Sequence, residues 1–291
     1  MKITVKAPAT SANLGSAFDA GGMAFKLYNE ISFKTSDSFK ISGCEERYAN
    51  DKNLAYLAYK SVLAEIGKEG EVEIEFIKTA VPLTRGLGSS ASLIVAGAYS
   101  ANELNGKKLS EEELLKVCAK IEGHPDNVAP ALFGGLCVSV CNGKNAFFVK
   151  KRVSDKLYFT ALIPEFKVST KDARKVLPFK VPFKSATYNL ARATLIPEAF
   201  ESGNLELIEE VTKDRLHQSY RKKLFKNAGE VEKLAREVGA RAFFVSGAGP
   251  THIAVSDREI ASELNERLKT LANGWTATTL EADNDGITEI K

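Results

Sequence analysis

A strictly alternating segment, followed by one that is apolar all round, constrains the fold of this 291-residue chain most. In EVEIEFIK, residues 71–78, Val72, Ile74 and Phe76 alternate with three glutamates, which predicts a strand with one buried and one exposed face. Such strands are typical of antiparallel sheets. From Ser90 to about Asn105 nearly every residue is small or apolar, which predicts a buried helix. The two segments together favour an α+β fold.

The rest of the first half carries shorter patterns. Ser110 and Glu113 match a capping box and predict a helix start, and the helix is expected to end near Gly123. An alternation from residue 2 predicts a strand that stops at Pro8. The other expected elements are a loop over 9–22, strands over 27–35 and 39–43, a helix over 51–67 with Leu54, Leu57, Ala58 and Val62 on one face, a polar loop over 122–135 and a strand within 134–143.

From about residue 152 the pattern restarts with a strand, which predicts two α+β domains with antiparallel sheets, covering 1–150 and 151–291. Two apolar runs around Gly249 and Pro250 predict a hairpin over 240–257. The further expected elements are strands over 157–164 and 274–282 and helices over 170–176, 185–200, 205–217, 229–238 and 258–272.

Charge, hydropathy and cysteine content argue against several classes of protein. Forty basic and 37 acidic residues give a net charge of +3, which does not favour a nucleic-acid or membrane surface. Since nothing resembles a signal peptide and no apolar run could span a membrane, we expect a soluble cytoplasmic protein. Cys137 and Cys141 have no second Cys/His pair to complete a zinc site, so these two are expected to be small buried residues.

The segment PLTRGLGSSAS, residues 82–92, joins the alternating strand to the buried helix. It formally fits a dinucleotide fingerprint, but Pro82 and an antiparallel strand are the wrong context for one. A Walker loop would need Lys-Ser/Thr after the glycine, and a nucleophile elbow would need glycine in place of Ser92. Exposed backbone N–H groups, serine hydroxyls and the start of a helix instead predict an anion cradle for a polyphosphate.

We expect this cradle to comprise Pro82, Arg85, Gly86, Leu87, Gly88, Ser89, Ser90, Ala91 and Ser92. A second glycine loop, SGAGPT at 246–251, has Gly247 and Gly249 around a small alanine, which could allow close approach to a phosphate or substrate. Alone, it is a weak signal.

Three motifs in this order, KAPATSANLGSAFD (6–19), PLTRGLGSSAS (82–92) and SGAGPT (246–251), resemble the signatures of the GHMP small-molecule kinases. The first motif, together with EGHPDNVAPALFGG (122–135) and HQSYR (217–221), is similar to the homoserine kinases in particular. Two departures are visible: Ala17 stands where glycine is common, and the helix opens with Ser-Ser-Ala-Ser where alanines are common. Neither departure changes a charged group.

The resemblance implies a ribosomal-S5-like N-terminal domain and a ferredoxin-like C-terminal domain. It also implies ATP as phosphoryl donor, Mg²⁺, and the γ-hydroxyl of L-homoserine as acceptor, which would place the reaction in threonine biosynthesis. A homodimer is a further implication. The alternative is another GHMP kinase with a different small acceptor, such as mevalonate or a sugar.

Residue roles follow from the resemblance. It implies that Glu122 and Ser90 bind the metal, that Arg174 and Arg221 bind the substrate carboxylate, and that Asn13 and Asp19 hold the amino end and the hydroxyl. Glu122 at a helix end opposes the helix dipole, a misfit that favours a functional role. Gly247, Gly249 and His124 are expected near the substrate, His124 in a supporting role, and Asn53 is expected at the adenine.

The run His124-Pro-Asp126-Asn127 bears on the proton transfer. An amide cannot accept a proton at neutral pH. We therefore expect Asn127 and Asp19 to align the hydroxyl without a strong side-chain base, because a loose transition state needs little help from a base. Asp126 is the alternative base.

Overall fold

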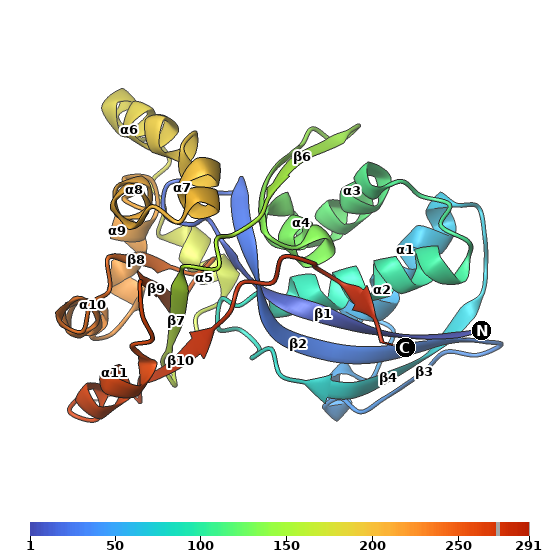
Figure 1. Ribbon diagram of the computed structural model, residues 1–291. Helices are drawn as coiled ribbons and strands as arrows, with labels where there is room; N and C mark the ends of the chain where they lie inside the picture. Colours follow the sequence, from blue (N-terminus) through green and yellow to red (C-terminus); the bar gives the residue numbers. More distant parts are fainter. Residues whose placement is uncertain (272–273, 291) are drawn as a thin grey trace.

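The computed structural model describes residues 1–271 and 274–290, which form two sheets side by side (Figure 1). The first sheet has the order β11-β1-β2-β4-β3, with β5 paired to β2 and β6 paired to β5. All its pairs are antiparallel except β3 with β4. Its strands are β1 (Lys2–Ala12), β2 (Gly21–Ser36), β3 (Lys40–Ser42), β4 (Glu71–Thr79), β5 (Leu136–Cys141), β6 (Ala146–Lys151) and β11 (Thr288–Glu289).

Four helices lie against one face of the first sheet (Figure 1). They are α1 (Leu54–Glu65), α2 (Ser89–Leu104), α3 (Glu111–Glu122) and α4 (Pro125–Phe133), and a short 3₁₀ turn, Glu46–Tyr48, precedes them. The buried face of β4 and the largely buried α2 belong to the same apolar core. This confirms both features from which the α+β fold was predicted.

The second sheet is fully antiparallel, with the order β10-β7-β9-β8. In chain order this is 4-1-3-2, the ferredoxin-like arrangement that the resemblance implied. Its strands are β7 (Tyr158–Ile163), β8 (Ala242–Val245), β9 (His252–Ser256) and β10 (Thr276–Leu280). The helices are α5 (Thr170–Lys175), α6 (Phe183–Ala193), α7 (Ile196–Ser202), α8 (Leu205–Val211), α9 (Gln218–Arg221), α10 (Ala228–Glu237) and α11 (Ala261–Leu268), with a 3₁₀ turn over Lys222–Leu224.

Two expectations about the first half are wrong for local reasons. The first strand does not stop at Pro8, because a bulge between Pro8 and Ala9 lets pairing with β2 continue to Ala12. Residues 125–133 form a helix rather than a loop, with Pro125 at its first position, where the missing N–H costs nothing. As a result, the turn after β1 and the segment before α4 lie close together.

Other differences are smaller. Leu57 is exposed, and the buried face of α1 is instead formed by Ala55, Ala58, Tyr59, Val62 and Leu63. The helix expected over 185–200 breaks near Leu195, and the one expected over 205–217 ends at Val211. Strand β6 was not predicted. The helix expected over 258–272 is α11, and residue 272 lies outside the described residues.

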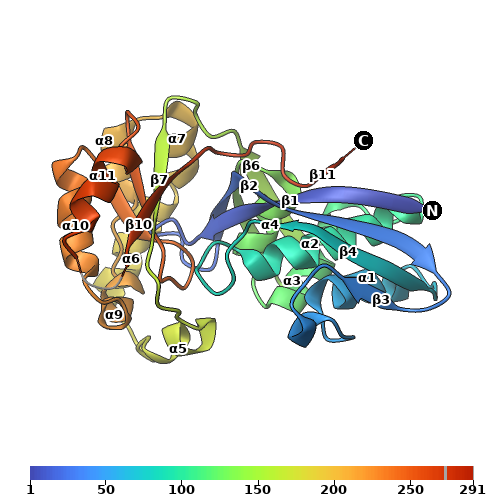
Figure 2. The same cartoon turned by 90° about the horizontal axis from the view of Figure 1, so that it is seen from below.

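The chain returns to its first sheet at the end. Val5 and Lys6 of β1 pair with Glu289 and Thr288 of β11, and Figures 1 and 2 both place β11 beside β1. The division into 1–150 and 151–291 stays a prediction, but these last residues are part of the first sheet.

No helix in the described part of the chain is long and apolar enough to cross a membrane.

Candidate functional site

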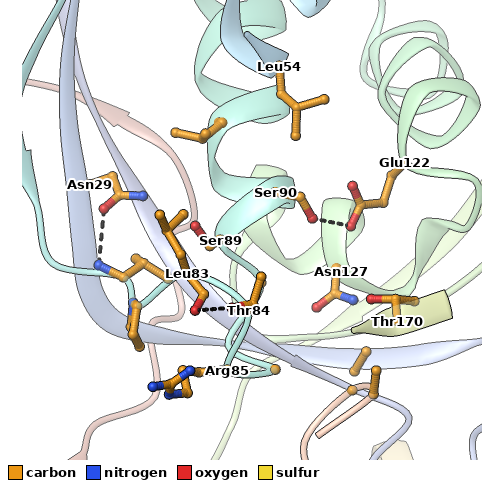
Figure 3. A pocket seen from close by; sticks show the side chains of 18 of the residues that line it. Asn29, Leu54, Leu83, Thr84, Arg85, Ser89, Ser90, Glu122, Asn127 and Thr170 are labelled. Atoms are coloured by element: carbon orange, nitrogen blue, oxygen red, sulfur yellow. Dashed lines mark hydrogen bonds between the residues drawn. The ribbon is translucent and has the colours of Figure 1, made fainter. Parts of the chain in front are cut away.

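A cavity of about 780 Å³ lies where the two sheets meet. Its walls come from the turn after β1, the starts of α2, α4 and α5, helix α9 and the loop between β8 and β9. Figure 3 shows part of this lining. These segments are far apart in sequence, and most of the residues singled out from the sequence meet here: Asn13, Asp19, Asn53, Pro82, Arg85, Gly86, Gly88, Ser89, Ser90, Glu122, His124, Asp126, Asn127, Arg174, Arg221, Gly247 and Gly249.

The start of α2 has the features from which an anion cradle was predicted. Gly88 caps the helix in the left-handed conformation, with φ of +68°, and the N–H groups that follow have no partner within the helix. A Cβ on Gly88 would lie 1.9 Å from the Thr10 hydroxyl, so only glycine lets β1 approach this closely. The Ser89 hydroxyl is buried without a hydrogen-bond partner and lines the cavity. An unsatisfied donor at a helix N-terminus suits an anion such as phosphate.

The two glycine loops pack against each other. A Cβ on Gly86 would lie 2.5 Å from the Ser246 carbonyl oxygen, and Gly86 has a φ of +80°. The Ser246 hydroxyl donates to the Gly86 carbonyl at 2.6 Å. Arg85 donates from Nη2 to the Glu165 carbonyl at 2.7 Å, while its Nη1 is buried without a partner. The second loop therefore supports the cradle from the other sheet.

Three residues assigned to the cradle do not line the cavity. Leu87, Ala91 and Ser92 are completely buried in the interior. The Ser92 hydroxyl donates to the Ser89 carbonyl and accepts from Asn29. Asn29 in turn accepts from the backbone N–H of Val81, a contact visible in Figure 3. Ser92 thus supports the segment that precedes the cradle. The buried positions of Leu87, Ala91 and Ser92 argue against direct contact between these residues and a ligand.

Glu122 lies beside the cradle. Ser90 donates to its carboxylate at 2.6 Å (Figure 3). Burial raises the pKa of Glu122, and the charge of Asp126 raises it further, against the lowering effects of Ser90 and His124. Among the described residues no lysine or arginine forms an ion pair with Glu122. No cluster of three or more metal-ligating side chains occurs in that part of the chain either. A cation here would take most of its ligands from elsewhere, as Mg²⁺ does from phosphates and water.

The start of α4 presents Asn127 to the cavity. Its Oδ1 accepts a hydrogen bond from the Thr10 hydroxyl at 2.7 Å, so its Nδ2 is the end left to face a ligand. Asp126 is buried and forms a hydrogen bond with Nδ1 of His124. Burial lowers the pKa of His124, but this bond and the charges of Asp126, Glu122 and Asp19 outweigh it and raise the pKa overall.

A pair of opposite charges also lines the cavity. Arg174, on α5, donates to both carboxylate oxygens of Asp19 at 2.9 and 3.0 Å. The Asn13 side chain links the two loops, accepting from the Asp19 N–H and donating to the Gly247 carbonyl. Arg221 is 2% exposed and forms no ion pair with a described residue. Burial lowers its pKa to about 10, and Arg174 contributes to this. A buried unpaired cation at a cavity suits an anionic ligand group.

Asn53 lines the cavity, but its side chain is already used. It caps α1 by accepting from the Ala55 N–H and donates to the Tyr48 carbonyl. The adjoining apolar wall was missed by sequence reasoning, because it combines separate segments without a motif. Its members are Gly43, Cys44, Tyr48, Leu54, Phe76, Thr79, Val81, Leu83 and Leu93, and Figure 3 labels Leu54 and Leu83. Thr170, at the start of α5, was missed for the same reason.

Comparisons with known proteins identify the family of this chain. Residues 53–135 match the GHMP kinases N terminal domain, and residues 196–273 match the GHMP kinases C terminal domain. The chain is 44% identical over 294 residues to a homoserine kinase of Clostridium beijerinckii, with 99% of each chain covered. It is 44% identical over 296 residues to one from Caldicellulosiruptor bescii, covering 98% of this chain and 96% of the relative.

Solved structures give the same picture. The crystal structure of homoserine kinase from Cytophaga hutchinsonii superposes with a TM-score of 0.89 at 30% identity, covering 99% of this chain and 97% of that one.

Proposed function

We propose a specific reaction for this chain, which belongs to the GHMP kinases and, within them, to the homoserine kinases. The protein transfers the γ-phosphoryl group of ATP to the γ-hydroxyl of L-homoserine. The hydroxyl oxygen forms a bond to the γ-phosphorus, the bond from that phosphorus to the β,γ-bridging oxygen breaks, and the products are ADP and O-phospho-L-homoserine.

One observation carries this proposal. A single cavity is lined by the start of α2, which suits an anion, and by an acid with two arginines: Asp19, Arg174 and Arg221. An amino acid has an ammonium for the carboxylate and a carboxylate for the guanidinium groups. Mevalonate has a carboxylate but no ammonium, and a sugar has neither group, so neither acceptor could use Asp19 together with both arginines.

The phosphates of ATP bind at the start of α2. The free N–H groups of its first turn and the unpartnered Ser89 hydroxyl donate to phosphate oxygens. The apolar wall around Leu54, Phe76 and Leu83 then receives the adenine. The adenine is thus assigned to this wall and not to the Asn53 amide, which already caps α1.

The site residues fit a divalent cation. Glu122 is a half-buried carboxylate that forms no ion pair with a described lysine or arginine, and Ser90 adds a hydroxyl beside it. These two residues would hold Mg²⁺, with phosphate oxygens and water completing its ligands. When bound, the metal neutralises charge on the phosphates.

The amino acid enters by exchanging partners with the Asp19–Arg174 ion pair. Its ammonium takes the place of Arg174 at Asp19, and its carboxylate takes the place of Asp19 at Arg174, with Arg221 as the second guanidinium. Each broken salt bridge is replaced by another between a carboxylate and a cation, so the exchange costs little free energy. The γ-hydroxyl is then directed toward Asn127.

Asn127 aligns the hydroxyl but cannot accept its proton. Thr10 occupies the amide oxygen, so the Nδ2 group donates to the substrate. Asp126 is buried and bonded to His124, whose raised pKa favours the imidazolium form, so this carboxylate is poorly placed to act as a base. The proton passes to an oxygen of the transferred phosphoryl group, which a loose transition state permits.

A substrate panel tests the proposal. ADP release from MgATP is measured with L-homoserine, L-threonine, L-serine, mevalonate and galactose in parallel. We expect the highest kcat/KM with L-homoserine and no turnover with mevalonate or galactose. Turnover with mevalonate but not with L-homoserine would refute the assignment and favour the alternative.

The cytoplasmic location and the homodimer remain predictions from the sequence. Sedimentation of the purified protein measures the oligomeric state directly, and a species of 31.6 kDa would contradict the dimer.

A further inference from the structure

His217 lies directly behind the proposed carboxylate site. It is completely buried and precedes α9, four residues before Arg221. Its Nε2 lies 2.7 Å from the Gly15 carbonyl oxygen, and its Nδ1 lies 3.2 Å from Nη1 of Arg221. A carbonyl only accepts and a guanidinium only donates. Nε2 therefore carries the proton, Nδ1 offers its lone pair, and the ring is neutral.

The hydrogen bonds of Arg221 account for three of its five N–H groups. Nε donates to the Ala173 carbonyl at 3.3 Å. Nη1 donates to the Gly247 carbonyl at 2.8 Å and to His217, which uses both of its hydrogens. Nη2 has no partner in the described part of the chain. The guanidinium is therefore rotated so that the Nη2 end is the one left for a ligand in the cavity that Arg221 lines.

The surroundings keep His217 neutral. The Phe18 ring stacks on it with centroids 4.9 Å apart. The charged groups facing it are Asp214, 3.8 Å away on the preceding turn, Arg221 on α9 and Asp19 on the turn after β1. Both Asp214 oxygens already accept from other groups, including the N–H groups of His217 and Gln218. Burial lowers the pKa of His217, and Arg221 lowers it further, against the opposing effects of Asp214, Gly15 and Asp19.

We propose that His217 is a positioning residue for substrate binding: its neutral Nδ1 holds the Arg221 guanidinium in the orientation that offers Nη2 to the carboxylate of the amino acid. This inference rests on the proposed function. His217 does not contact the substrate; it acts through Arg221. Without an acceptor at Nδ1, the guanidinium loses one of the three contacts that set its rotation.

Two substitutions separate the contacts of His217. In His217→Asn the amide oxygen lies near the position of Nδ1 and can still accept from Arg221. In His217→Gln the amide nitrogen lies near the position of Nε2 and can still donate to Gly15, but the acceptor for Arg221 is lost. We expect His217→Gln to raise KM for L-homoserine about 10-fold or more, the size of one hydrogen bond to a charged group, with little change in kcat or in KM for ATP. His217→Asn should stay within about threefold of the wild type.

An analogue without the carboxylate provides the internal control. 3-Amino-1-propanol keeps the ammonium and the hydroxyl of homoserine but has nothing for Arg221 to bind. The ratio of kcat/KM for L-homoserine to kcat/KM for this analogue does not depend on the fraction of folded enzyme. We expect this ratio to fall about 10-fold or more in His217→Gln and to be nearly retained in His217→Asn. Equal ratios in the wild type and His217→Gln would overturn the proposal, even if both variants are unstable.

The wild-type protein supplies a second measurement. The same ratio should stay constant as the pH falls through the ordinary histidine range near about 6.5, because burial lowers the pKa of His217 and Nδ1 keeps its lone pair for Arg221, whereas effects of Asp19 and His124 are common to both substrates and cancel. A ratio that declines in this range would contradict a neutral His217 and count against the proposal. Absence of turnover of L-homoserine by the wild type would instead be a failure of the proposed function.

Discussion

Ser90 connects the half-buried carboxylate of Glu122 to the first turn of α2. The proposed function assigns this hydroxyl to the phosphate end of the cavity and the ion pair between Asp19 and Arg174 to the amino-acid end. Because the two pairs share no hydrogen bond among the described residues, single substitutions can test each assignment separately.

The substitution Ser90→Ala tests the phosphate end. It removes the donor to Glu122 and a candidate metal ligand, so we expect KM for MgATP to rise and kcat to fall, together about 10- to 100-fold in kcat/KM. The dissociation constant of L-homoserine, measured by calorimetry without nucleotide, should change less than twofold. Ser61→Ala is the matched control, because that hydroxyl donates only to the Leu57 carbonyl on α1. Equal losses for both ligands would contradict the assignment.

Asp126→Asn tests the absence of a side-chain base. If the carboxylate accepted the hydroxyl proton, this change would abolish turnover with nearly unchanged KM. We expect instead a decrease in kcat of about 10-fold or less, caused by the weaker bond to His124. Steady-state kinetics at saturating ATP and L-homoserine measure the difference, and a loss of several orders of magnitude would identify Asp126 as the base.

At the scale of single elements, α2 depends on close contact between its first turn and β1. Gly88→Ala places a Cβ 1.9 Å from the Thr10 hydroxyl and puts an alanine at a φ of +68°. Gly106→Ala imposes similar strain, with a φ of +83°, but has open space around its Cβ. The pair of variants separates the clash from the backbone strain.

We expect Gly106→Ala to lower the free energy of unfolding by about 1 kcal/mol and Gly88→Ala to lower it by about 2 kcal/mol more. Urea unfolding measures both. Gly88→Ala should also lower kcat, because Thr10 holds the Asn127 amide. Similar stability of the two variants would show that β1 yields to the added methyl group.

The elements differ in how far the sequence could predict them. The capping box at Ser110 and the alternation of β4 are local signals, and the structure confirms both. Residues 122–135 were predicted to be a polar loop, so helix α4 was missed, although Pro125 is well suited to a first helical position. Ala91 was assigned to the ligand with its neighbours, yet one turn of a helix cannot direct consecutive side chains at one place.

In the candidate site, too, local motifs could be predicted from the sequence and contacts between distant segments could not. Residues in compact motifs, such as Ser89, Ser90 and Asn127, could be predicted together because a motif brings its own geometry. The partners Thr10 and Asn29 and the apolar wall could not, since tertiary contacts between distant segments select them. The pairing of Arg174 with Asp19 is likewise a product of the fold.

At the scale of the whole molecule, neither sheet holds the site alone. Arg174 reaches Asp19, Gly247 accepts from Asn13, and Arg85 donates to Glu165, each contact joining segments of the two halves. The stability of the arrangement therefore affects the site. The three histidines are the side chains whose ordinary pKa lies near neutrality, so the fold can shift their titration into the range where pH changes stability.

The pH dependence of stability should follow His252. Burial lowers its pKa to about 4. The unfolded chain takes up a proton at about pH 6.5, so acid favours unfolding, and about 3 kcal/mol of stability is lost as the pH falls from 6.5 to 4. His217, with a lowered pKa, acts in the same direction, and His124, with a raised pKa, acts in the opposite one.

Urea unfolding between pH 5 and 7 measures this slope. His252→Asn keeps a donor for the Pro250 carbonyl but does not titrate, so its stability should vary less steeply with pH than that of the wild type, whatever its absolute value. An identical slope in the variant would contradict the assignment.

The return of β11 to β1 has a consequence for the order of synthesis. The ribosome releases β1 first, yet the strand that covers its outer edge contains Thr288 and Glu289. The first sheet therefore keeps an open edge through most of translation, while the second sheet can complete itself as soon as β10 has emerged. An open edge invites pairing with other nascent chains. The growing polypeptide is therefore open to such pairing until β11 has emerged.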